Sequence, residues 1–139
     1  MQLGIEGYRA EVALDTPAVN VIGFERAPRN KKEEEVLESA AQRFRNEPLV
    51  QPEQQGESCE VESAEVHSAL LHDRDAEGDH AEFSVVQQLA CSQMLSEGGI
   101  RATVLETYPD IERLRLEWIS DSSQGATDLT PSEAVFQAR

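Results

Sequence analysis

Residues 59–91 read CEVESAEVHSALLHDRDAEGDHAEFSVVQQLAC, and the rest of the chain is interpreted as a scaffold around this stretch. Cys59 and Cys91 stand at its two ends, and all three histidines of the chain lie between them. Residues 59–66 alternate weakly, and residues 80–91 place Phe83 and Leu89 on one face, as a half-buried strand does. We therefore predict an antiparallel hairpin around an acidic loop, with the two cysteines meeting at the end away from that loop.

The two cysteines suit a single bridge, because each ends a strand-like segment. They are too few for a disulfide-stapled mini-protein, and their spacing is not that of a zinc ribbon. A bridge between Cys59 and Cys91 would require an oxidising compartment, whereas two reduced core cysteines would suit a cytoplasmic protein. The sequence starts with no basic, apolar leader, so either a signal peptide has been removed or the protein is cytoplasmic.

The charge is strongly negative and unevenly spread. Acidic residues outnumber basic ones 27 to 12, for a net charge of −15. From Glu57 to Glu82 there are nine acids and one arginine, a net −8 and more than half of the total. Phosphate backbones and anionic membrane surfaces are therefore poor partners, and cations or basic proteins are favoured. No apolar run approaches the roughly 20 residues of a membrane span, so we expect no membrane insertion.

A length of 139 residues predicts one domain over residues 1–139. Asn30 with Glu33 has the form of a helix capping box, and Pro48 stops the helix that it starts, near residues 30–46. Its apolar stripe consists of Val36, Leu37, Ala40, Ala41 and Phe44. Strands are predicted at 5–15, 19–24, 100–106, 114–118, 126–130 and 133–138, with a linker or exposed loop at 48–58. The sum is an α+β fold, an antiparallel, β-rich, sandwich-like domain with one main helix.

The acidic loop, at about residues 67–80, has the ligands of a zinc site. Zinc takes neutral imidazole and carboxylate oxygens, commonly four in a tetrahedron. Histidines stand at both ends of the acidic run, so the loop can fold two imidazoles and one or two carboxylates onto one ion. The alternative is a set of exposed histidines in a solvated loop, with weak binding or none. The predicted metal ligands are His72, His80, His67, Asp73, Asp75 and Asp79.

A calcium site is a weaker alternative for the same loop. Asp73, Asp75, Glu77 and Gly78 match the opening of an EF-hand loop. The twelfth position should be a bidentate glutamate, but it is Ser84, and no helix is predicted before the loop. We predict no enzyme, because the sequence has no G-x-S-x-G, no H-E-x-x-H and no glycine-rich phosphate loop.

Four stretches of the chain, in order and spanning nearly its whole length, match a known pattern: Pro17 to Pro28, Cys59 with the hydrophilic insert after it, His80-Ala81-Glu82-Phe83 leading to Cys91, and Tyr108 to Ile119 with Gln124-Gly125-Ala126. In these stretches the chain resembles the ZrgA-type family of zinc-regulated zinc-uptake proteins, formerly a domain of unknown function. The resemblance implies a periplasmic protein that binds zinc with histidines between its two cysteines and helps a zinc ABC importer or its binding protein. The alternative is a structural or interaction domain of the same fold without a specific metal site.

Overall fold

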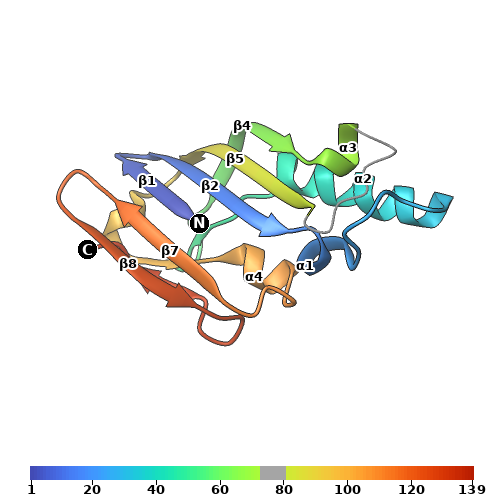
Figure 1. The fold of residues 1–139 in the computed structure, drawn as a ribbon. Coiled ribbons are helices and arrows are strands. Elements are labelled where there is room, and N and C mark those ends of the chain that lie inside the picture. The colour runs from blue at the N-terminus through green and yellow to red at the C-terminus, as the bar shows by residue number, and fades with distance from the viewer. Residues whose placement is uncertain (73–80) are drawn as a thin grey trace.

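A computed structural model, which describes residues 1–72 and 81–139, has two β-sheets and several helices around one core (Figure 1). The large sheet has the order β4-β5-β2-β1-β7-β8, and the small one the order β3-β6-β9. Neighbouring strands are antiparallel except β1 and β7, which are parallel. The predicted α+β, β-rich fold is confirmed.

The large sheet comprises β1 (Gln2–Glu6), β2 (Arg9–Pro17), β4 (Cys59–His67), β5 (Glu82–Cys91), β7 (Leu114–Ile119) and β8 (Gln124–Leu129). The remaining elements are β3 (Gln51–Pro52), β6 (Gly99–Arg101), β9 (Val135–Gln137), α1 (Val19–Ile22), α2 (Lys31–Asn46), α3 (Ala69–His72), α4 (Thr103–Thr107) and a 3-10 turn at Leu95–Glu97.

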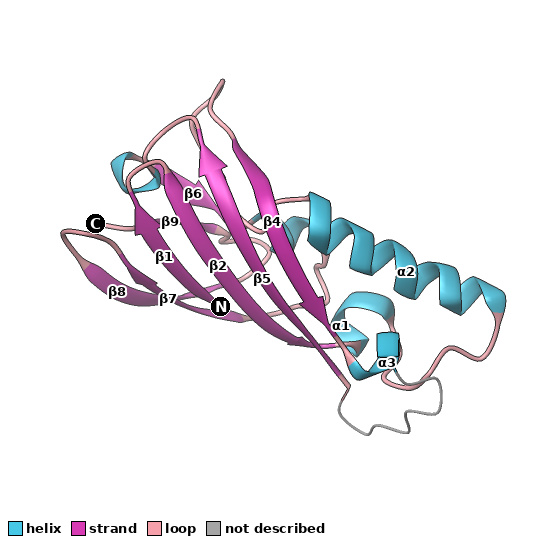
Figure 2. Cartoon of the chain, turned by 90° about the horizontal axis from the view of Figure 1, so that it is seen from above, coloured by secondary structure: helices cyan, strands magenta, loops and turns pink. Residues whose placement is uncertain are grey.

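The core follows the period-2 pattern of the strands. In β7 the residues Leu114, Leu116 and Trp118 are buried and their neighbours are exposed, as the sequence predicts. Buried residues of both sheets, α2 and α4 form one hydrophobic cluster. Helix α2 lies beside β4, at one edge of the large sheet (Figure 2).

The hairpin of β4 and β5 is confirmed. Its register runs from Cys59 opposite Cys91 to His67 opposite Ser84, with an irregularity between Val61 and Ser63. Cys59 and Cys91 form the disulfide at the end away from the acidic loop.

Helix α2 is also confirmed, and its start is the predicted cap. The Asn30 side chain accepts a hydrogen bond of 2.8 Å from the Glu33 backbone N–H. Leu37, Ala40, Ala41 and Phe44 are buried. Val36 is 39% exposed, so its predicted place in the core stripe is wrong.

The predicted single strand at 5–15 is wrong, because it is broken by a turn. Gly7 has φ +58°, a left-handed conformation that glycine adopts without the cost a side chain would add. The chain therefore reverses between β1 and β2, which pair as a hairpin. Tyr8 lies in this turn and is 59% exposed, instead of facing the core with Ala10.

Two other predicted strands are partly or wholly helical. The predicted strand at 19–24 is wrong: Val19–Ile22 form α1, a single turn that Gly23 caps at φ +86°. The predicted strand at 100–106 ends at Arg101 and continues as α4, which buries Val104 and Leu105. Short apolar runs rich in β-branched residues fit either structure, and packing decides between them. The predicted linker at 48–58 is also corrected, since it holds β3 and buries Leu49 and Val50.

Candidate metal centre

Two of the predicted ligands lie on described elements at one end of the β4–β5 hairpin. His67 is the last residue of β4, is exposed, and lies opposite Ser84 of β5. His72 is the last residue of α3, the single helical turn that follows β4. The side chain of His72, together with His80, Asp73, Asp75 and Asp79, lies outside the described residues. Among the residues that are described, no three His, Cys, Asp or Glu side chains are grouped to hold a metal ion. The ligand set therefore stays a prediction.

The first end of the acidic loop is anchored by α3. Ser68 is buried, and its hydroxyl oxygen accepts a hydrogen bond of 3.3 Å from the Leu70 N–H. The Ser68 carbonyl accepts a second, of 3.1 Å, from the Leu71 N–H. Leu70 is 3% exposed and belongs to the core. The prediction that the acidic loop begins at about residue 67 is therefore wrong. The sequence Ser68-Ala69-Leu70-Leu71, a hydrogen-bonding serine before an apolar turn, is the local signal for this helical turn.

The second end of the loop is anchored at Ala81. This residue is buried, and its carbonyl accepts a hydrogen bond of 2.8 Å from the Ala18 N–H. The next residue, Glu82, already pairs with Pro17 of β2. Residues 73–80 therefore join two points that the core holds in place. The part played by Ala18 comes from a contact distant in sequence, which no local pattern announces.

The described surroundings of the loop ends are acidic. The register aligns His67, Ser84 and Asp15 across three strands, and Ser84 Oγ donates a hydrogen bond of 2.6 Å to Asp15 Oδ1. Glu65 and Glu82 are exposed near the same end of the hairpin. Clustered carboxylates produce a negative potential that raises the local concentration of cations.

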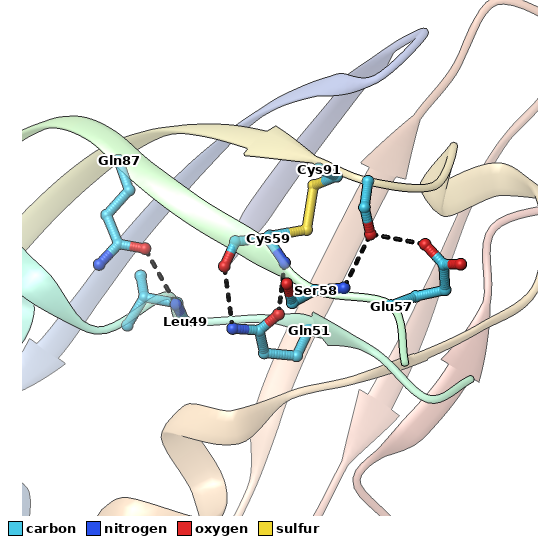
Figure 3. Close-up of a disulfide and its surroundings, with 8 residues drawn as sticks. Leu49, Gln51, Glu57, Ser58, Cys59, Gln87 and Cys91 are labelled. Carbon is cyan, nitrogen blue, oxygen red and sulfur yellow. Dashed lines mark hydrogen bonds between the residues drawn. A yellow bond between two sulfur atoms is a disulfide. The ribbon is translucent and has the colours of Figure 1, made fainter. Parts of the chain in front are cut away.

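The disulfide lies at the far end of the hairpin (Figure 3). From Cys59 to His67, β4 advances by eight residue steps, or roughly 26 Å at about 3.3 Å per residue. The Cys59 backbone is also held by the amide of Gln51, which accepts from its N–H at 2.7 Å and donates to its carbonyl at 3.1 Å (Figure 3). The cysteines therefore staple the hairpin, and their bonded sulfurs are not thiolate ligands.

A buried glutamine joins this hairpin to α2. Gln87 of β5 is 0% exposed, and its Oε1 accepts a hydrogen bond of 2.9 Å from the Leu49 N–H (Figure 3). Its Nε2 donates to the carbonyls of Phe44 and Glu47, at 2.8 Å each. In a continuing helix the Phe44 carbonyl would accept a hydrogen bond from the N–H of residue 48, but Pro48 has no N–H. Gln87 shares the inward face of β5 with Phe83 and Leu89, but no local sequence pattern indicates that its amide bonds to α2.

Comparison with known proteins gives one family. A comparison with curated proteins gives no match. The model of the family described as ZrgA family zinc uptake protein matches residues 1–138. That match covers the disulfide hairpin and both anchored ends of the acidic loop. The chain therefore belongs to the ZrgA family of zinc uptake proteins.

Proposed function

We propose that the protein captures zinc in the periplasm with its acidic loop and passes the ion to an ABC-type importer or that importer's binding protein. Family membership ties the chain to zinc uptake. The observation that carries the proposal is this membership in a chain whose three histidines all lie between its two cysteines. Zinc is the cargo here, and the protein performs no chemical reaction on it.

The proposed ligands are His72 and His80 with carboxylates from Asp73, Asp75 and Asp79, and His67 can complete the set. The two anchored ends support this assignment, because a loop with fixed ends loses less entropy when it closes on an ion. The site is assembled from a loop, so its zinc is exchangeable, as delivery to another protein requires. Protons compete with zinc for the imidazoles, so zinc affinity falls at low pH.

The disulfide also supports the periplasm, because disulfides persist in oxidising compartments and are rare in the cytosol. Within residues 1–72 and 81–139, none of the helices has the length and apolar composition needed to cross a bilayer.

The test is a calorimetric zinc titration of the oxidised, metal-free protein and of the variant His72→Ala/His80→Ala. Saturable binding, micromolar or tighter, that the double variant loses is the expected result. The matched control is Glu34→Ala/Glu35→Ala on α2, which removes two exposed charges from another surface and leaves zinc binding intact. His67→Ala alone reports whether the end of β4 takes part.

Two results would contradict the assignment of the zinc site to the acidic loop. Zinc binding that the double variant leaves unchanged would place the ion elsewhere, and no binding at all would favour an interaction domain without a metal site. A parallel calcium titration tests the EF-hand alternative, which requires binding that Asp75→Asn weakens and His80→Ala does not.

A further inference from the structure

The outer face of the large sheet contains a hollow of about 1060 Å³. Strands β1, β2, β5, β7 and β8 and the turn after β7 line it. We call this feature the outer-face hollow, and its centre is at Gly4. Much of its lining comes from the outward-facing neighbours of the buried residues Leu3, Val12 and Trp118, and Leu3 and Trp118 contribute to the lining as well.

The register of the strands explains why the sheet is hollowed here. One row of cross-strand neighbours runs Gln88, Glu11, Gly4, Ile119, Gln124. Gly4 gives this row no side chain at its middle, and a Cβ added there would meet no atom within 4 Å. The adjacent row has alanines, Ala13 and Ala126, on either side of Gln2 and Glu117. Short side chains at the centre and longer ones around it leave a concave surface.

The charge of the outer-face hollow is negative. Glu6, Glu11, Glu117 and Asp121 line it. Of the described side chains that line the hollow, Arg9 is the one cation, and its guanidinium pairs with Glu62 at 3.1 Å. Ile119 adds an apolar surface that is 57% exposed. The Met1 ammonium also lies close enough to Glu117 for electrostatic attraction. The hollow therefore joins an excess of carboxylates over cations to a small apolar surface.

We propose that the outer-face hollow binds a lysine- or arginine-rich segment of a protein partner. Ammonium or guanidinium groups would pair with the carboxylates, while their aliphatic stems lie over Ile119 and the bare backbone at Gly4. Anionic membranes and nucleic acids are repelled by the same carboxylates. A second copy of this chain also carries −15, so repulsion between like net charges disfavours it as the occupant. The inference is independent of zinc binding by the acidic loop.

The test uses the oxidised, metal-free full chain and a fluorescein-labelled hexalysine peptide, followed by fluorescence anisotropy at low salt. Polylysine is attracted to any acidic protein, so the variants must separate the hollow from total charge. Gly4→Val fills the hollow without changing charge, and valine suits a strand. Its matched control is Ser63→Val. Ser63 lies in β4, on the same face of the large sheet as Gly4, but does not line the hollow.

A second pair of variants tests the charges. Glu6→Gln/Glu11→Gln/Glu117→Gln removes three carboxylates from the outer-face hollow. The control removes three exposed carboxylates from α2 and consists of Glu34→Gln/Glu35→Gln/Glu38→Gln. Both triple variants have the same net charge, so a difference between them reports location.

We expect Gly4→Val and the hollow triple variant each to weaken peptide binding about tenfold, as three exposed ion pairs would together. Both control variants should bind the peptide with an affinity within about twofold of that of the wild type. Equal losses in the two triple variants, or wild-type binding by Gly4→Val, would overturn the proposal. If Gly4→Val does not fold, Ala13→Val fills the adjacent row and replaces it. Zinc titration of Gly4→Val should match the wild type, so failure of this proposal is distinct from failure of zinc capture.

Discussion

Replacing Gln87 by methionine should destabilise the protein strongly while leaving its packing nearly unchanged. The two side chains have similar length and volume, and volume-conserving core changes are tolerated best. Methionine cannot make the three hydrogen bonds of Gln87, to the Leu49 N–H and to the carbonyls of Phe44 and Glu47. The loss therefore isolates the cost of leaving these backbone groups unpaired.

The magnitude follows from which of the three partners is buried. The hydrogen bonds to Leu49 and Phe44 are buried, and the one to Glu47 is partly buried. A stranded buried group costs about 1–3 kcal/mol, and a group that reaches water costs less. We therefore expect a loss of about 3–5 kcal/mol, a large part of the roughly 5–15 kcal/mol of a typical domain. The melting temperature should fall by about 10 °C or more.

The measurement is urea unfolding of the oxidised protein, followed by circular dichroism. We propose that residues 1–139 form one domain, so a single cooperative transition is expected. The control is Gln88→Met, one residue away in β5, where the amide makes an exposed hydrogen bond of 2.9 Å to Glu11. This control should change the unfolding free energy by less than about 1 kcal/mol.

A loss below about 1 kcal/mol for Gln87→Met would refute the reasoning. It would mean that water or a shifted backbone satisfies Leu49 N–H and the Phe44 carbonyl at little cost. An equal loss in Gln88→Met would also count against it, since the burial of the amide would then not matter.

The other predictions concern the hairpin staple and the start of α2. Removing the disulfide by Cys59→Ser/Cys91→Ser should cost about 3–4 kcal/mol in urea unfolding, since it closes a long loop, and an unchanged midpoint would contradict this. Asn30→Ala should cost about 1 kcal/mol by losing the helix cap, whereas the exposed Ser39→Ala should not. The hydrogen bond from Arg26 lowers the pKa of Glu33 from 4.5 to about 2. The stability that this pair provides is complete above about pH 5 and is lost as the pH falls toward 2, so Glu33→Gln should be less stable at neutral pH and converge on the wild type in acid. If the difference in unfolding free energy between the wild type and Glu33→Gln stays constant from pH 6 to pH 2, ionisation of Glu33 does not cause that difference.

Local sequence patterns were sufficient to predict the elements in which those patterns extend over many residues. The cap at Asn30 and the stripe ending at Phe44 predicted α2, and strict alternation around Leu116 predicted β7. The pairing of Cys59 with Cys91 was predicted because each stands at the end of a strand-like segment, with a polar loop between the two segments. Each of these signals extends over enough residues for its period to be unambiguous.

The errors fall where the signal is short. Gly7 stands in the middle of a good alternating pattern, and only its left-handed conformation turns one strand into a hairpin. Residues Val19–Ile22 have the composition of a strand, but the Ala18 N–H bonds to the Ala81 carbonyl and Ile22 is buried. Contacts between segments distant in sequence decide such cases, because local propensity differs by too little.

The sequence alone determined that this protein is acidic and that its histidines lie between two cysteines. It also predicted a helix near residues 30–46 and a hairpin around the acidic loop. These properties depend on composition and local period, so they can be read without coordinates. Only the tertiary structure decided that β1 lies parallel to β7, that Gln87 bonds to α2, and that Ser68 and Ala81 anchor the ends of the acidic loop. The physical reason is that each joins segments whose mutual position depends on how the whole chain buries its apolar surface.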